Sequence, residues 1–279
     1  MSSSEMGAPY ADFSAEMAPA VWRAARVARA LEGRVPNQPK ADEATAVKQA
    51  LTAADAAAQE QVLEQLRARF PDVSLAAEED TGSVAAFTPG SRALVIVDPI
   101  DGTLHSYLEG GGPYAVIVGL ALARVYAAGL VALPREGLLF RTDDRGGALM
   151  ERAGGAPRPA QITGEGRRIL VSHGMPASVG KRLGERGYEV ISACGGAVSV
   201  APLIPGVVAG VRHAGGEGGV SIRGRVGVVI SRAAGARVVG DADGPFPDDM
   251  DTLAHTLRVA ADDALIDVLG DALAAAGIG

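Results

Sequence analysis

Two aspartates, Asp98 and Asp101, follow directly on the aliphatic segment 92–97. Pro99 stiffens the chain between them and Gly102 permits a sharp turn, so both carboxylates should converge on one point. Carboxylates this close repel each other, and one pKa would rise unless a divalent cation shares them. Oxygen-only ligand sets favour magnesium, calcium or manganese, and magnesium is held by few carboxylates together with substrate phosphate. The spacing therefore predicts a cation centre, most simply for magnesium.

A second acidic pair, Glu78 and Glu79, follows the short apolar segment 73–77. Ligands in α/β folds gather at one edge of the sheet, so these side chains could reach the same point as the aspartates. The carbonyl of Ile100 could add a main-chain oxygen. Taken alone, the glutamates fit a solvated acidic loop, and the aspartates fit a turn about as well as a cation site. The whole string DPIDGT after a buried strand is harder to explain by turn chemistry.

The elements that must position these acids are predicted from periodicity and turn residues. Apolar residues at helical spacing predict a helix over 10–32, and Thr52 with Asp55 forms a capping pair before a second helix that ends at Phe70. An antiparallel meander of strands follows, and then helices alternate with strands. The expected strands are 73–77, 92–97, 114–123, 125–133, 138–141, 148–151, 168–172, 189–192, 237–239 and 257–260, and the later helices are 178–186, 197–209, 226–234 and 263–275.

The glycine- and proline-rich region 154–166 is the predicted boundary between two halves. Residues 1–160 form an N-terminal half that carries the acidic signature, and residues 161–279 form a C-terminal half that completes a pocket. A chain of 279 residues is compatible with two fused halves.

Composition excludes several classes of function. Hydrophobic residues make up 48% of the chain and charged residues 21%, as in globular proteins, and the net charge of −7 gives no basic surface for nucleic acid. An anionic substrate would therefore need local cations. The single cysteine, Cys194, cannot form an intramolecular disulfide and should be a small buried side chain. No leader sequence or long apolar run is evident, so we expect a cytoplasmic protein without a membrane span.

Four segments together resemble the inositol monophosphatase family, which lies within a wider superfamily of lithium-sensitive, magnesium-dependent phosphatases. VDPIDGT at 97–103 is similar to the family signature, LTAAD at 51–55 to its V-T-x-x-D, and AEE at 77–79 to its G-E-E. CGGAV at 194–198 stands where the family has a glycine, a small hydroxyl residue and alanines. The likeness extends over residues 10–275, strongly in the first half and weakly in the second.

The resemblance implies an α+β fold, a layered αβαβα sandwich of the inositol monophosphatase and fructose bisphosphatase type. It implies magnesium-dependent hydrolysis of a phosphate monoester on a small polyol, sugar or related metabolite. It also implies one or two Mg²⁺ ions, with Mn²⁺ as a substitute, and a homodimer. No nucleic-acid or membrane partner is expected.

The resemblance also assigns roles to individual residues. Glu78, Asp98 and the Ile100 carbonyl would hold one Mg²⁺, and Asp98 and Asp101 would contribute to a second. Thr103, paired with Asp55, would position and activate the attacking water, with Glu78 as a further catalytic residue. The substrate-binding residues would be Gly102, Thr103, Gly195, Gly196, Ala197, Glu217 and Arg223.

The match breaks at the family's last metal ligand, an aspartate in a W-D-x-A-A-G segment upstream of an A-G-G turn. Ala234–Ala236 stands for that turn, and counting back from it arrives at Arg223. Either the glycine-rich stretch 215–224 hides a gap, so that Glu217 or another acid serves, or Arg223 replaces the ligand. A guanidinium there would supply positive charge and could clamp a phosphate. Two alternative functions follow: non-catalytic binding of a phosphorylated ligand, or elimination or group transfer on one.

Overall fold

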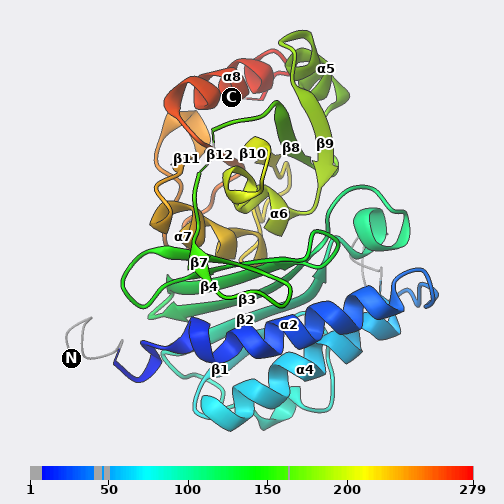
Figure 1. Cartoon of the computed structure of the whole chain (residues 1–279), viewed down its shortest axis with the longest axis vertical. Helices are drawn as coiled ribbons and strands as arrows, with labels where there is room; N and C mark the ends of the chain where they lie inside the picture. Colours follow the sequence, from blue (N-terminus) through cyan, green and yellow to red (C-terminus); the bar gives the residue numbers. More distant parts are fainter. Residues whose placement is uncertain (1–7, 41–45, 47–50, 163, 279) are drawn as a thin grey trace.

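The computed structural model describes residues 8–40, 46, 51–162 and 164–278. Helices and sheets stack in five layers, visible from bottom to top in Figure 1. The outer helices α2 (Phe13–Leu31) and α4 (Ala53–Arg69) cover one face of the first sheet. The inner helices α6 (Gly195–Ser199) and α7 (Val226–Ala233) separate it from the second sheet, which α5 (Ala177–Glu185) and α8 (Asp263–Ala274) cover. The expected α+β sandwich of αβαβα layers is confirmed.

The first sheet has seven strands in the order β1 to β7. Only β1 and β2 pair in parallel, and every later pair is antiparallel, which confirms the predicted meander. The strands are β1 (Ser74–Ala77), β2 (Ala93–Asp101), β3 (Ala115–Leu122), β4 (Val125–Leu133), β5 (Leu138–Thr142), β6 (Ala148–Arg152) and β7 (Arg158–Pro159).

The second sheet has five strands in the order β11-β12-β10-β8-β9. They are β8 (Arg168–Ser172), β9 (Glu189–Ala193), β10 (Val207–His213), β11 (Arg237–Val239) and β12 (Thr256–Ala260). Short helical turns complete the described chain at Ala8–Tyr10, Val84–Ala86, Thr103–Leu108, Ala201–Leu203, Arg223–Arg225 and Asp241–Asp243. One sheet ends near residue 159 and the other begins near 168, but the division into halves at residue 160 stays a prediction. None of the described helices combines the length and hydropathy needed to cross a bilayer.

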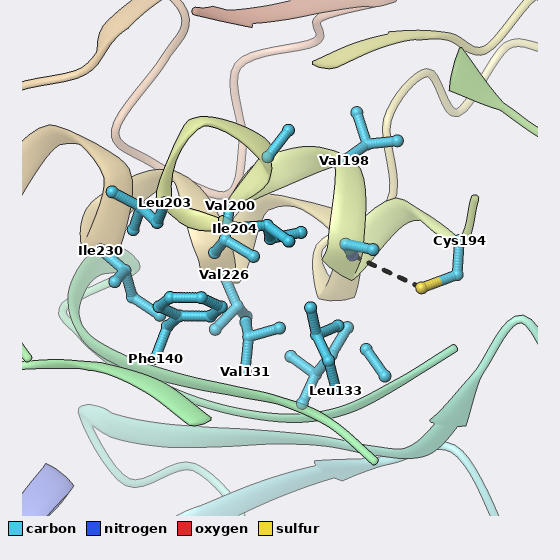
Figure 2. Close-up of a cluster of buried hydrophobic side chains, with 14 of the residues drawn as sticks. Val131, Leu133, Phe140, Cys194, Val198, Val200, Leu203, Ile204, Val226 and Ile230 are labelled. Atoms are coloured by element: carbon cyan, nitrogen blue, oxygen red, sulfur yellow. Dashed lines mark hydrogen bonds between the residues drawn. The ribbon is translucent and has the colours of Figure 1, made fainter. Parts of the chain in front are cut away.

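The first sheet is buried on both faces. Along β2, Val95 and Val97 belong to the core under α2 and α4, whereas Ile96 belongs to the core beneath α6 and α7. This alternation follows from the two-residue period of a strand. Figure 2 shows the second of these cores, where side chains of the first sheet, such as Phe140, meet Val226 and Ile230 from α7.

The predicted helix over 197–209 is wrong. That segment forms α6, a single turn at Ala201–Leu203, and then β10, which lies at the centre of the second sheet between β12 and β8. Pro202 and Pro205 prevent a continuous helix because proline lacks the N–H that an interior position requires. The segment after them is apolar because β10 is covered on both faces, and such a run has no period that distinguishes strand from helix.

Two glycines lock the inner helix layer onto the first sheet. Gly119 on β3 and Gly129 on β4 are directly paired, and together they leave a hollow for Val226 at the start of α7. A β-carbon at Gly129 would lie 2.8 Å from the Val226 carbonyl oxygen, and one at Gly119 would lie 2.6 Å from Val226 Cγ2. The close approach brings the segment 223–225 down to the edge of the first sheet.

We expect Gly129→Ala to destabilise the protein by about 1–3 kcal/mol, because the added carbon meets backbone that cannot rotate away. Urea unfolding followed by circular dichroism would measure the change. Gly184→Ala is the matched control, since a β-carbon at that position in α5 has nothing within 4 Å. Equal stability of the two variants would contradict the tight contact between α7 and the sheet.

Candidate active site

The acidic residues meet at the carboxyl ends of the two parallel strands. Ala77 on β1 is paired with Val97 on β2, so Glu78 and Asp98 each follow one member of a register pair. Parallel strands deliver the residues that follow them to the same edge of the sheet. A bulge between Asp98 and Asp101 interrupts the pairing of β2 with β3 and turns the chain beyond it.

Glu78, which is half-buried, and Asp98, which is buried, each carry a carboxylate oxygen without a partner. Asp98 is only 4% exposed, and both its Oδ1 and the Glu78 Oε2 are buried without a hydrogen bond from any described residue. Burial, with the neighbouring charges of Glu78 and Asp101, raises the Asp98 pKa well above its ordinary value, while the charge of Arg223 opposes that rise. Unpaired buried oxygens on adjacent acids are the arrangement that a cation would satisfy.

The oxygen donors at this edge of the sheet fit a magnesium ion by type. Glu78, Asp98 and the Ile100 carbonyl offer two carboxylates and one main-chain oxygen, a set that magnesium completes with water or phosphate. Asp101 is partly committed, because its Oδ2 accepts a 2.5 Å hydrogen bond from the Gly196 N–H. Within the described ranges, no three side chains of the His, Cys, Asp and Glu types gather as a cation site.

Thr103 and Asp55 form the hydroxyl–carboxylate pair that the sequence predicts. The Thr103 Oγ1 lies 3.0 Å from Asp55 Oδ1 and 2.7 Å from the Ile100 carbonyl oxygen. Asp55 reaches it from the first turn of α4, where it closes a capping box by accepting hydrogen bonds from the N–H (2.8 Å) and hydroxyl (2.7 Å) of Thr52. The cap therefore fixes the carboxylate that faces the threonine.

Asp55 is fully buried, and this burial raises its pKa from 3.8 to about 6. Its hydrogen bonds with Thr52 and Thr103 act in the opposite direction, and the charge of Glu79 adds to the rise. The carboxylate is therefore ionised at neutral pH and protonated in mild acid.

The signature turn packs directly against the 194–197 segment. Gly102 has a φ of 91°, a left-handed conformation that favours glycine, and a β-carbon there would lie 2.7 Å from Cys194 Cβ. Thr103 opens a short helix, which takes the π form over Thr103–Leu108. Gly195, Gly196 and Ala197 are buried beside this turn, and Cys194 is buried as predicted.

Arg223 reaches the end of the first sheet. Its Nη2 donates to the Ala77 carbonyl at 2.9 Å and its Nε to the Val97 carbonyl at 3.4 Å. These carbonyls belong to the residues immediately before Glu78 and Asp98. The guanidinium thus brings a positive charge to the acidic pair, as its effect on the Asp98 pKa shows. Glu217, in contrast, is exposed on the loop after β10 and makes no hydrogen bond or ion pair within the described part of the chain, so its role stays a prediction.

Two side chains near the site were missed from the sequence. Lys40 forms a 2.7 Å ion pair with Glu79, which leaves Glu78 as the acid free to face Asp98. The side-chain amide of Gln59 makes two hydrogen bonds with the Glu79 backbone: its Nε2 donates to the Glu79 carbonyl, and its Oε1 accepts from the Glu79 N–H. Because Gln59 lies four residues after Asp55 on α4, helical spacing could have placed it on the same face. No comparable pattern marks Lys40.

The solvated loop expected for the glutamates alone is wrong for Glu79, which is 6% exposed.

Comparison with known proteins supports this architecture. The model of the inositol monophosphatase family matches residues 14–186, well over half of the chain. The matched range includes the acidic signature and ends before Gly195 and Arg223. Histidinol-phosphatase of Chlorobaculum parvum is 32% identical over 100 residues, which cover 36% of this chain and 37% of that protein. The alignment thus spans little more than a third of that relative's length.

Solved structures resemble the whole chain. The extragenic suppressor protein suhB of Bartonella henselae aligns with a TM-score of 0.69 at 17% identity, over 92% of this chain and 96% of its own. The inositol monophosphatase of Anabaena aligns with a TM-score of 0.66 at 21% identity, over 94% and 95%. At such low identities these structures show a shared fold only. Membership of the family is shown by the match of the family model to residues 14–186. The chain belongs to the inositol monophosphatase family, a family of phosphoric monoester hydrolases.

Proposed function

We propose that the protein hydrolyses phosphate monoesters of a small polyol, sugar or related metabolite in a magnesium-dependent reaction. The observation that carries the proposal is the unpartnered oxygens of Glu78 and Asp98, together with the contact of Thr103 with Asp55 and with the Ile100 carbonyl on the same strand as Asp98. A cation ligand set and a hydroxyl–carboxylate pair joined through one strand suit attack by water on phosphorus.

Each residue has a distinct role in the proposal. Glu78, Asp98 and the Ile100 carbonyl hold Mg²⁺, which when bound neutralises phosphate charge and acidifies the attacking water. Thr103 orients that water through its hydroxyl, and Asp55 accepts the hydroxyl proton, so that the threonine oxygen is free to accept in turn. The amides of Gly102 and Thr103 contact the phosphate oxygens. No phosphoenzyme is required, because the water attacks directly.

In this proposal the positive charge of Arg223 stabilises the substrate phosphate, as a second cation would. Its guanidinium lies at the strand ends, on the residues before Glu78 and Asp98, and the residue count from Ala234–Ala236 aligns it with the family's last carboxylate ligand. A fixed positive charge can stabilise the phosphate but cannot acidify water as a metal does. We therefore propose a site with one strongly held Mg²⁺ and slower turnover than two ions would give.

The direct test is phosphate release from a panel of metabolites with Mg²⁺, with Mn²⁺ and with EDTA. The panel includes inositol monophosphates, histidinol phosphate, sugar phosphates and glycerol phosphates. Release that requires the cation supports the proposal. Mass analysis of the products separates hydrolysis from elimination or group transfer, which would leave a dehydrated or modified product.

A non-catalytic protein that binds a phosphorylated ligand is the second candidate. The position of Arg223 favours it, because this residue brings a positive charge to the strand ends that carry Glu78 and Asp98. Binding of panel members without any cation-dependent turnover would support this candidate. The homodimer and the cytoplasmic location expected from the sequence stay predictions.

Arg223→Asp should strengthen Mg²⁺ binding by about tenfold or more, since even the outer partners of metal ligands are each worth about 10- to 100-fold in affinity. Calorimetric titration with Mg²⁺ measures the change. Arg223→Gln is the matched control, because it removes the positive charge without adding a carboxylate. If the aspartate variant binds Mg²⁺ no more tightly than the glutamine variant, Arg223 does not occupy a ligand position.

A further inference from the structure

A second arginine lies beside the site without a partner. Arg212 is on β10, the central strand of the second sheet. Its Nη1 is buried and has no hydrogen bond, although the residue as a whole is partly exposed. No ion pair among the described residues includes it. The Arg212 guanidinium therefore has no anionic partner among the described residues.

Two glycines form the slot that holds this guanidinium. A β-carbon added at Gly195 would overlap Nη1 of Arg212 and lie 2.9 Å from its Cζ. A β-carbon at Gly224 would also overlap Nη1 and lie 3.0 Å from Cζ. Neither glycine has a positive φ, so the backbone conformation does not demand glycine at either position. The absence of side chains there makes room for the arginine.

The slot is continuous with the candidate active site on both sides. The neighbours of Gly195 are Cys194, which packs against the signature turn, and Gly196, which binds Asp101. Gly224 directly follows Arg223, whose guanidinium lies at the strand ends. Arg212 thus lies between Gly195, next to the segment that packs on the signature turn, and Gly224, which follows Arg223 in the chain.

Among the described residues, the buried arginines each have at least one partner, although the Nε of Arg258 is also buried without one. The Arg225 guanidinium donates to the carbonyls of Val220, Asp249 and Thr252. The Arg141 guanidinium binds the Glu151 carboxylate at 2.7 Å. A buried charged donor without a partner is unfavourable for folding, and such groups are retained where a ligand satisfies them.

We propose that Arg212 binds a second anionic group of the substrate, apart from the phosphate ester that is hydrolysed. The inference rests on the proposed function and narrows its substrates to phosphate esters that also carry a carboxylate or another phosphate. A guanidinium suits both groups because its planar fork matches their paired oxygens.

Matched pairs of substrates test the proposal. Glycerol 3-phosphate is compared with 3-phosphoglycerate, and fructose 6-phosphate with fructose 1,6-bisphosphate, so each pair differs mainly in the second anion. The carboxylate pair and the phosphate pair show which anion Arg212 prefers. Arg212→Gln should raise KM about 10- to 100-fold for the preferred doubly anionic substrate, the size expected for charged hydrogen bonds, and leave its single-anion counterpart unchanged.

Gly224→Ala should reproduce the effect of Arg212→Gln, because the new methyl group displaces the guanidinium while the charge remains. Arg237→Gln is the control, since Arg237 lies exposed on β11 of the same sheet and pairs with Asp263. A KM increase of equal size for both members of each pair would overturn the proposal, because Arg212 would then hold the phosphate that is cleaved. No change in either member would also overturn it.

Binding in EDTA separates this inference from the proposed function. Calorimetry without a divalent cation measures the preference for 3-phosphoglycerate over glycerol 3-phosphate when no hydrolysis occurs. A preference that Arg212→Gln abolishes supports the anion site even if the panel shows no turnover. The unliganded Arg212→Gln protein should melt at the same or a higher temperature, so a loss of binding cannot be assigned to unfolding.

Discussion

Asp98→Asn is expected to reduce cation-dependent phosphate release by about 1,000-fold or more. Asp98 is the buried ligand of the proposed Mg²⁺, and its Oδ1 has no partner in the unliganded protein. A catalytic cation contributes several kcal/mol to the transition state, and each ~1.4 kcal/mol is a factor of ten in rate. An amide keeps the shape of the side chain but removes the charge that holds the ion. Steady-state assays with the best substrate of the panel measure the loss.

The same substitution should have the opposite effect on the unliganded protein. The folded-state pKa of Asp98 is raised, so folding favours the protonated acid, and the ionised form opposes folding as the pH rises above about 4. At neutral pH without Mg²⁺, Asp98→Asn should therefore melt at a higher temperature than the unmodified chain and should lose the stabilisation by Mg²⁺. Asp80→Asn, at an exposed neighbouring acid, is the control. Full activity of Asp98→Asn would exclude the proposed centre.

Much of the N-terminal half could be predicted from the sequence because its signals are local. The Thr52–Asp55 capping box marks the start of α4, and alternating or continuous apolar runs mark the strands of the meander. That Glu78 and Asp98 could reach the same edge of a sheet was expected, but the pairing of their strands was not predicted. The parallel pairing of Ala77 with Val97 supplies it, although the roles of the two acids stay predictions.

The C-terminal half resisted prediction for physical reasons. β10 is covered on both faces, so its apolar residues carry no period, and the segment was predicted to be part of a helix. Arg212 was therefore placed on no sheet and received no role. The guanidinium of Arg223 was expected near the cation site from a count of residues, but its contacts with two strand-end carbonyls depend on α7 packing into the hollow between Gly119 and Gly129.

Thr103→Val should reduce turnover about 100- to 10,000-fold, the range found when a positioned proton-transfer group is removed. Valine has nearly the same shape as threonine but cannot orient water or donate to the Asp55 carboxylate, which lies 3.0 Å away. Thr103→Ser keeps the hydroxyl and should retain most of the activity. Cation binding should be little changed in both variants, because the hydroxyl is not a proposed ligand. Equal activity of the valine and serine variants would show that the hydroxyl has no part in the reaction.

The pH dependence of kcat tests the role of Asp55 in the Thr103–Asp55 pair. Asp55 has a pKa of about 6, so we expect kcat to fall as the pH drops through that value, because a protonated carboxyl cannot accept the threonine proton. The fold should not fail at the same point: a raised carboxyl pKa makes the protonated form the one that folding favours, so this group adds stability as the pH falls from about 6 toward 4. Activity should therefore disappear while circular dichroism and the melting temperature still report a folded protein. Coincident loss of activity and structure would assign the acid limb to unfolding, and a flat profile down to pH 5 would remove Asp55 from the proposed proton path.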